Sequence, residues 1–270
     1  MVVKAQVTDQ VVIAELKAMK FSDEYVETPR RLIVSSTGRE KTGKSHFAFT
    51  APPPIVLFDI DIGTEGVVGK FQDAGKYFLR YEVRVPKEAK QDVYVPMWSD
   101  LKARIKKAYT LSTGTVVWDT ATEAYELARL SHFGKLSQVQ PHNYVEVNNE
   151  WRDLLRTAFD STMNTVFIHK MKPVWLNTTT SDGKSRSTKT DRFELSGFSE
   201  MDYLAQVNVI HYREDSQEGG GMPDFSTFIK DCRSTPNVNG TVLRGPMCNF
   251  EFLLSLVHDK PKGEDAGASV

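Results

Sequence analysis

Eight residues in the first fifth of the chain have the types and the spacing that hold a chain of phosphates. The segment Gly38–Ser45 matches the pattern G-x-x-x-x-G-K-[S/T] without a gap. Glycines let the backbone turn its N–H groups inward around a phosphate, and the start of a following helix adds partial positive charge. Lys44 would reach the β- and γ-phosphates, and the Ser45 hydroxyl would ligate Mg²⁺. The predicted nucleotide-binding residues are Gly38, Arg39, Glu40, Lys41, Thr42, Gly43, Lys44, Ser45 and His46.

A phosphate loop of this kind also needs a carboxylate on the metal side. The run Thr115–Asp119 has four strand-forming, non-acidic residues followed by one aspartate. We expect a buried strand beside the strand that precedes the phosphate loop, with Asp119 holding Mg²⁺ through water and Ser45. The alternative is that Asp119 caps a helix that begins near Thr120. The predicted metal-side residues are therefore Ser45 and Asp119.

Hydrolysis requires a group that orients the attacking water, and acidic residues follow the apolar run Ile55–Ile60. Asp61 would stand at the tip of this strand and face the γ-phosphate, and Glu65 could reach the same place through the turn at Gly63. The alternative is a solvated acidic loop. His169 closes a later apolar strand, where it is either a γ-phosphate sensor or an ordinary strand end. The predicted catalytic residues are Lys44, Asp61, Glu65 and His169.

Short apolar runs alternate with amphipathic helices along the chain. This alternation predicts an α/β fold, with helices on both sides of a mostly parallel central sheet. One helix is expected from Ser99, as N-cap, to Thr110, and another carries an apolar stripe that begins at Trp151. Two late strands are expected to pair antiparallel. The expected strands are 31–36, 55–60, 77–83, 115–119, 165–169, 207–212 and 225–229.

The composition limits the class of protein and its partners. Apolar residues make up 40% and charged residues 26% of the 270 residues, which are ordinary globular values. The net charge of -1 means that a nucleic-acid partner would need a local basic patch. Two cysteines without a Cys-x-x-Cys pattern exclude a disulfide scaffold and the usual thiolate zinc site. With no apolar run of membrane-spanning length, we expect a cytoplasmic protein with an extension at 1–28, one domain at 29–258 and a flexible tail at 259–270.

The order of Gly38–Ser45, Ala51–Pro54 and Ile55–Asp61 resembles the phage-type RecA-like ATP-binding proteins. These are small P-loop ATPases, often described only as an AAA domain, and some act in single-strand annealing or recombination. The resemblance runs from about Leu32 to Leu256, and Gly38–Ser45 is its specific part. It implies a RecA-like core, use of ATP and Mg²⁺, self-assembly on single-stranded DNA, and phage replication or recombination proteins as partners in the host cytoplasm.

The resemblance also shows where this chain departs from related ATPases. RecA-like proteins usually carry a catalytic glutamate at the position of Asp61, so we expect slow hydrolysis unless Glu65 substitutes for it. Asp119 is followed by Thr120 and not by glutamate, so the chain lacks the Asp-Glu pair of the ring-forming AAA-plus ATPases.

Two polar stretches, 134–149 and 177–192, lie where RecA-like proteins have DNA-binding loops. The second has four basic and two acidic residues, many hydroxyl groups and no large apolar side chain, so we expect it to be mobile and to contact phosphates. Trp175 or Phe193 could stack on a base; the alternative is a solvated hairpin tip. The predicted DNA contacts are Lys184, Arg186, Lys189 and Arg192, and Lys230, Arg233 and Arg244 are candidates to reach the ATP of a neighbouring subunit.

Three functions are compatible with these residues. The first is an ATP-dependent protein of RecA type that binds single-stranded DNA. The second is a nucleotide-gated interaction or assembly protein that turns ATP over slowly and binds no DNA. A small-molecule kinase also uses a phosphate loop, but the middle of the chain has no arginine-rich lid segment.

Overall fold

The computed structural model describes residues 2–23, 29–86, 90–135, 139–179, 185–214 and 224–259. Internal contacts divide the chain into Met1–Arg30 and Arg31–Val270. The first unit contains helix α1 (Val2–Ala18), on which the apolar residues Val11 and Ile13 are about half exposed, at 54% and 51%. Nearly all of the tail predicted at 259–270 lies outside the described residues, and the domain limits stay a prediction.

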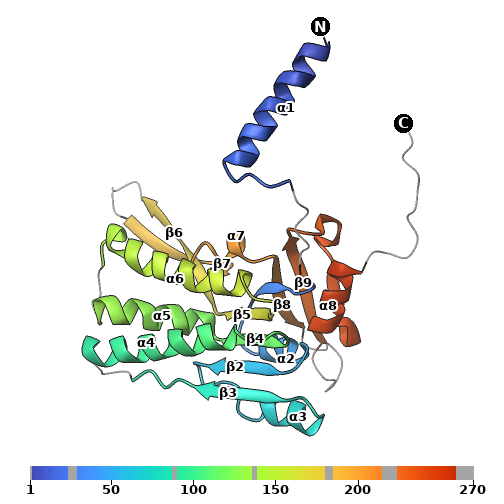
Figure 1. Ribbon diagram of the computed structural model, residues 1–270. Coiled ribbons are helices and arrows are strands. Elements are labelled where there is room, and N and C mark those ends of the chain that lie inside the picture. Colours follow the sequence, from blue (N-terminus) through green and yellow to red (C-terminus); the bar gives the residue numbers. More distant parts are fainter. Residues whose placement is uncertain are drawn as a thin grey trace. The chain divides into compact units, whose positions relative to one another are not determined.

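The second unit is built on an eight-stranded sheet with the order β10-β9-β8-β1-β5-β4-β2-β3 (Figure 1). The strands from β3 across to β8 run parallel, whereas β9 runs antiparallel to both of its neighbours, β8 and β10. The predicted α/β fold is confirmed, with its mostly parallel sheet and late antiparallel strands. The bounds are β1 (Ile33–Gly38), β2 (Ile55–Asp59), β3 (Phe78–Glu82), β4 (Thr115–Asp119), β5 (Asn164–His169), β8 (Val207–Glu214), β9 (Asp224–Cys232) and β10 (Val242–Arg244).

One expectation about this sheet was wrong. Strand β4, which ends in Asp119, does not lie beside the phosphate-loop strand β1, because β5 pairs with both of them. The carboxyl end of β5 therefore opens between the phosphate loop and Asp119. The order of the strands along the chain does not predict this arrangement. β5 follows β4 in the sequence, but in the sheet it lies between β4 and β1.

Helices cover the two faces of the sheet in two groups. Strand alternation sends Val116 and Trp118 into a core with α4 (Gln91–Ala108), α5 (Ala121–Phe133) and α6 (Tyr144–Phe159), where α7 (Met201–Leu204) also packs. Val117 points the other way, into a core with α2 (Lys44–Phe49), α3 (Val67–Asp73) and α8 (Phe250–His258). The apolar stripe predicted around Trp151 is buried on α6. Short 3-10 turns complete the unit at Pro141–Asn143, Pro236–Val238 and Gly245–Met247.

Helix α4 corrects a predicted boundary. Ser99 is not an N-cap, because the helix begins at Gln91 and continues through Pro96. Tyr94 and Trp98 are buried one turn apart on the same face, and Trp98 stacks on Trp151 with ring centroids 6.1 Å apart. Burial of two large aromatic side chains offsets the cost of a proline inside a helix, which is about 3 kcal/mol.

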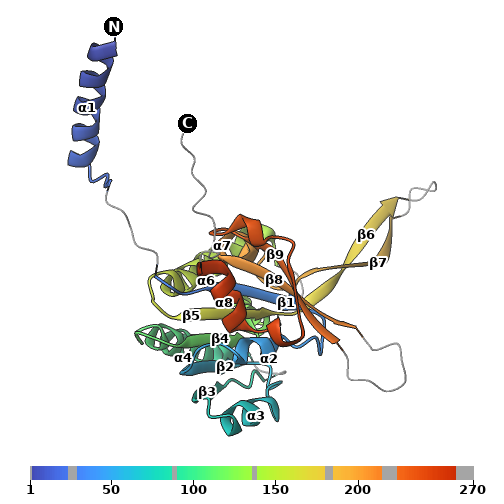
Figure 2. The same ribbon diagram turned by 90° about the vertical axis from the view of Figure 1, so that its right-hand side faces the viewer.

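A second, two-stranded sheet consists of β6 (Met171–Thr179) and β7 (Ser185–Leu195), and it extends away from the large sheet (Figure 2). The predicted mobile stretch 177–192 is therefore a β-hairpin in its described part, because backbone pairing needs no apolar side chains. Lys184 lies outside the described residues. The other predicted loop, 134–149, is also more ordered than expected, since α6 begins at Tyr144.

Candidate nucleotide-binding site

The loop between β1 and α2 has a backbone that only particular residues can adopt. Lys41 and Gly43 have left-handed φ angles of 58° and 88°. A Cβ on Gly38 would lie 2.7 Å from the Thr42 hydroxyl oxygen and 2.8 Å from the backbone oxygen of His211, so a side chain there would force the loop open. The Thr42 hydroxyl donates a hydrogen bond to the backbone oxygen of Arg39 (2.8 Å), which closes the loop on itself.

The Lys44 side chain folds back into this loop. Its ammonium group donates to the backbone oxygens of Gly38 (3.0 Å) and Arg39 (2.6 Å). Burial lowers the pKa of Lys44, against the opposing effects of the charges on Asp119 and Glu40. These two carbonyl oxygens are weak substitutes for phosphate oxygens, so the ammonium is positioned to exchange them for a bound anion.

Ser45, in the first turn of α2, contacts Asp119, the last residue of β4. The Ser45 hydroxyl donates to Oδ2 of Asp119 at 2.6 Å, although the two residues are 74 positions apart. Burial raises the pKa of Asp119 to about 6, partly offset by this hydrogen bond, and the charges of Asp59 and Asp61 act in the same direction as burial. Thr120 rather than Asp119 caps α5, because its hydroxyl accepts from the Glu123 backbone N–H (3.2 Å). A hydroxyl and a buried carboxylate with uncompensated charge suit a hard divalent cation such as Mg²⁺.

Lys170 joins two of the acidic residues beside this pair. It follows β5 directly, and its ammonium donates to Asp61 (3.0 Å) and to Glu123 (2.7 Å). Burial alone would lower the pKa of Lys170, but the hydrogen bonds to the two carboxylates outweigh it and raise the pKa. Sequence reasoning selected the neighbouring His169 and missed Lys170. The available signal was its place at the tip of a buried strand.

The other acidic residues at the end of β2 and in the turn that follows it have different surroundings. Asp59 is fully buried and accepts hydrogen bonds from Thr64 (2.5 Å) and from the Arg80 guanidinium (2.6 Å), so its charge is already compensated. Glu65 is exposed in the turn before α3 and has no hydrogen bond or ion pair with any residue that the structure describes. Of the two carboxylates predicted to orient water, Asp61 is the one that lies beside Asp119, whose backbone oxygen accepts from the Asp61 N–H (3.3 Å).

His169 lies at the carboxyl end of β5 but is only 1% exposed. Strand alternation places it on the side of Phe167, away from α2 and the phosphate loop. Burial lowers the pKa of His169 to about 3, so the ring is neutral, and neither ring nitrogen has a partner among the described residues. The γ-phosphate role assigned to His169 stays a prediction, and this geometry does not favour it.

A series of buried polar contacts links the end of β1, which leads into the phosphate loop, to β8 and β9. The ring of His211 accepts or donates hydrogen bonds with Ser36 on β1 (2.9 Å) and with Thr227 on β9 (3.0 Å). Thr227 in turn contacts Sγ of Cys248 at 2.9 Å. Burial, and then the charge of Lys44, lowers the pKa of His211 to about 3, so this link is a neutral one.

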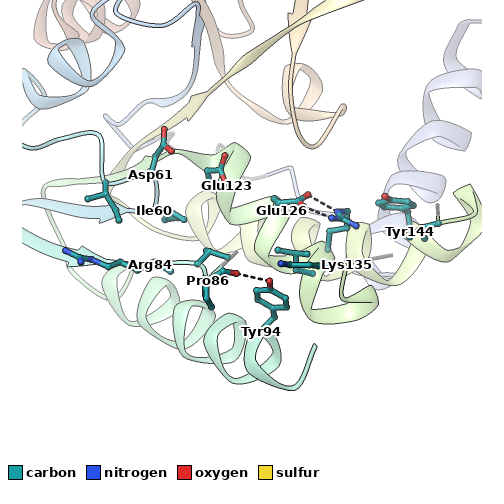
Figure 3. Close-up of a pocket in the computed structure, with 15 residues that line it drawn as sticks. Ile60, Asp61, Arg84, Pro86, Tyr94, Glu123, Glu126, Lys135 and Tyr144 are labelled. Atoms are coloured by element: carbon teal, nitrogen blue, oxygen red, sulfur yellow. Dashed lines mark hydrogen bonds and ion pairs between the residues drawn. The ribbon is translucent and has the colours of Figure 1, made fainter. Parts of the chain in front are cut away.

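Three cavities adjoin the site. A cavity of about 730 Å³ lies beyond Asp61 and Glu123, whose side chains stand together at one end of it in Figure 3. Within it Arg129 is already paired with Glu126 (2.5 and 2.7 Å). A second cavity of about 670 Å³ separates the phosphate loop from the hairpin, and a third of about 310 Å³ lies between Gly43 and the start of β9.

The residues predicted to bind DNA and to act on a neighbour are scattered. Lys189 and Arg192 are exposed on β7, and Trp175 on β6 is 56% exposed. Arg186 belongs to the same strand, where its backbone pairs with that of Thr178. By contrast, Lys230 pairs with Asp202 and Arg233 donates to the backbone oxygen of Tyr203, near the end of β9 that lies away from the phosphate loop. Arg244 on β10 is paired in register with Ser226, near the loop end.

A glycine-rich loop after a central parallel strand, with a lysine inside it and a serine bonded to a distant aspartate, defines a P-loop nucleotide-binding protein. A family model described as an AAA domain matches residues 30–209, and the chain belongs to this family, AAA_24. It is a P-loop ATPase domain.

Among solved structures, the chain is similar to a prototypical ATPase from the type III secretion system of pathogenic bacteria. The two share 10% sequence identity and a TM-score of 0.42 over 70% of this chain and 60% of that chain. No curated protein matches the sequence. Within the described residues, no helix has both the length and the apolar character needed to cross a membrane.

Proposed function

We propose that the protein is a Mg-ATP hydrolase of RecA type that couples its nucleotide state to single-stranded DNA, in phage recombination or replication. The observation that carries the ATPase part is the 2.6 Å contact between Ser45 and Asp119. It brings the hydroxyl of the phosphate loop and a buried carboxylate to one point, where each can serve a metal-bound triphosphate. When bound, Mg²⁺ neutralises charge on the β- and γ-phosphates.

The chain's own residues then have distinct tasks. Lys44 leaves the carbonyl oxygens of Gly38 and Arg39 for phosphate oxygens, which are stronger acceptors for a cation. Lys170 is attracted to the same negative charge, because it lies at the tip of the strand between β1 and β4. Its departure frees Asp61, which can then accept a hydrogen bond from the attacking water and hold it in line.

The hairpin β6–β7 supports the DNA part of the proposal. It carries exposed cations and the exposed ring of Trp175, the two components that bind single strands. It is also tied to the nucleotide site: β6 begins at Met171, directly after Lys170, and the Arg39 guanidinium lies 5.0 Å from the ring centre of Phe193 on β7. A change at either contact would reach the hairpin.

The test is ATP turnover with and without single-stranded DNA, beside a Lys44→Ala control. We expect turnover that depends on Lys44 and rises with DNA. The double variant Lys189→Glu with Arg192→Glu should weaken DNA binding and reduce the slope of log affinity against log salt by about 1.4, since about two phosphate contacts are lost. The matched control, Lys106→Glu with Lys107→Glu, changes the same charge on the exposed face of α4. Equal effects of both double variants would reject the hairpin as the DNA site.

A nucleotide-gated assembly protein is the second candidate, and the pairing of Asp61 with Lys170 favours it. If this ion pair persists when ATP binds, no free carboxylate orients the water and turnover stays slow. Nucleotide would then change self-association instead, with Arg244 as a candidate contact to a neighbour. Sedimentation with and without ATP, on the parent chain and on Arg244→Ala, separates this function from the first.

A further inference from the structure

The cavity of about 310 Å³ beside the phosphate loop has an aromatic wall. Phe225 is the second residue of β9, and its ring lies against Gly43. A Cβ built on that glycine would be 3.3 Å from the ring edge. The same ring is 39% exposed, so one part of it touches the loop while another part is open. An uncovered aromatic ring beside a phosphate loop is a surface on which a flat, apolar ring can stack.

The direction in which a nucleotide must lie follows from the sheet. Its terminal phosphate belongs with Lys44 and with the Ser45–Asp119 pair, and Asp119 ends β4, two strands from β1 on one side. Phe225 lies on β9, two strands from β1 on the other side. A triphosphate is an extended chain, so the end that carries the sugar and base leaves the loop away from Asp119. That direction leads to the cavity at Phe225.

The two remaining cavities are less suitable for the base, because of where they lie relative to the phosphate loop. The large cavity of Figure 3 begins at Asp61 and Glu123, on the terminal-phosphate side of the loop. The cavity between Arg39 and Phe193 is lined by 39–42 of the loop, by the hairpin and by 210–213 of β8, and its lining does not include Gly43 or the start of α2. The cavity at Phe225 instead reaches Gly43 and His46 at the start of α2, where the inner phosphates of the nucleotide would lie.

We propose that the nucleotide base binds in this cavity and stacks on Phe225, which makes Phe225 the residue that selects a purine base. This inference rests on the proposed function, because it assumes a nucleoside triphosphate in the loop. Cys248 forms part of the cavity wall and is fixed there by its contact with Thr227. The thiol of Cys248 is therefore covered when the base is bound and accessible when the cavity is empty.

The first test compares ATP with inorganic tripolyphosphate, which has the phosphates but no base. Phe225→Ala should weaken ATP binding by about 5- to 140-fold, the range for loss of one aromatic–base stack, and leave tripolyphosphate binding unchanged. Phe225→Tyr should retain ATP affinity. The matched control is Tyr144→Ala, which removes a half-buried ring from the wall of the cavity in Figure 3. Weaker ATP binding by the Tyr144 variant but not by Phe225→Ala would overturn the proposal.

The second test leaves Phe225 in place and measures alkylation of Cys248 by iodoacetamide. Cys232 is 2% exposed and is replaced in the variant Cys232→Ser, so that one thiol remains. Burial raises the pKa of Cys248, so the reaction is followed at about pH 9. We expect ATP to slow alkylation and tripolyphosphate to leave its rate unchanged.

Two outcomes of these tests have different meanings. If ATP and tripolyphosphate protect the thiol equally, the base is elsewhere and the proposal fails while the ATP site stands. If neither ligand binds the parent chain more tightly than it binds Lys44→Ala, the phosphate loop is not a nucleotide site, and the proposed function fails as well.

Discussion

Replacement of Asp119 by asparagine should make the nucleotide-free protein more stable while abolishing its Mg-dependent turnover. The carboxylate is 5% exposed, and burial, together with the charges of Asp59 and Asp61, raises its pKa to about 6. Asparagine keeps an oxygen that accepts the hydroxyl hydrogen of Ser45 but carries no charge. The substitution therefore removes the destabilising charge and retains the contact.

The magnitude follows from the pKa of Asp119, which rises from 3.8 to about 6. Each pKa unit corresponds to about 1.36 kcal/mol, so the ionised carboxylate costs the folded state about 3 kcal/mol at about pH 8. Because the folded state keeps its proton longer than the unfolded chain, the free energy of unfolding falls as pH rises through this window. The gain from Asp119→Asn should therefore be about 3 kcal/mol at about pH 8, about half of that near pH 5 and close to zero well below about pH 4.

The assay is urea unfolding in the presence of a chelator, at the two higher pH values, with thermal unfolding as a second probe. A gain of about 3 kcal/mol corresponds to a rise in Tm of about 6–12 °C for a domain of this size. The matched control is Asp59→Asn, a buried carboxylate that is bonded to Arg80 and Thr64 and whose loss should destabilise the fold. A loss of stability in Asp119→Asn at about pH 8, or a gain that does not change with pH, would refute the reasoning.

Three other substitutions test the remaining parts of the site and the fold. Lys170→Ala should lower kcat by at least about tenfold with little change in ATP affinity, and Lys170→Arg should restore part of the rate; steady-state kinetics with separate binding measurements decide this. His169→Leu should leave turnover intact and raise the free energy of urea unfolding by about 1 kcal/mol, because it removes a buried ring with two unpartnered nitrogens; a loss of turnover would instead support the γ-phosphate role. Gly114→Ala should cost at least about 2 kcal/mol in chemical unfolding, since its φ is 116° and a Cβ would collide with the backbone oxygen of Pro54, whereas Gly63→Ala, with open space around it, should cost less than about 1 kcal/mol.

The central part of the large sheet could be predicted because strands β1, β2, β4 and β5 are buried on both faces. Strands such as β2 and β4 are short, continuous apolar runs. Such a run predicts a buried strand even when the order of the strands in the sheet is not known. The hairpin β6–β7 could be foreseen only as the alternative of a solvated hairpin tip, since main-chain pairing holds it together and its side chains are mostly polar. The order of the strands could not be predicted either, because the position of β5 between β1 and β4 depends on tertiary contacts and not on local sequence.

The residues of the candidate site also fall into two groups, those that local sequence identifies and those whose role depends on the folded structure. Lys44 and Ser45 belong to one contiguous motif, and Asp119 could be found because it ends a strand of non-acidic residues. Lys170 acquires a role only through the positions of Asp61 and Glu123 in space. Asp59 is the converse case, an acidic residue next to the site whose charge is neutralised by the contact with Arg80.

Only Lys170 separates β5 from β6, so a rotation of the backbone at this residue would move the hairpin relative to the large sheet. The nine residues of β6 extend over about 30 Å at about 3.3 Å per residue. A rotation of about 5° at Lys170 would displace the far end of such a strand by about 2.6 Å, close to the rise of one residue. A change in the backbone at Lys170 would therefore displace the far end of the hairpin, at a distance where salt screens the charge of the phosphates.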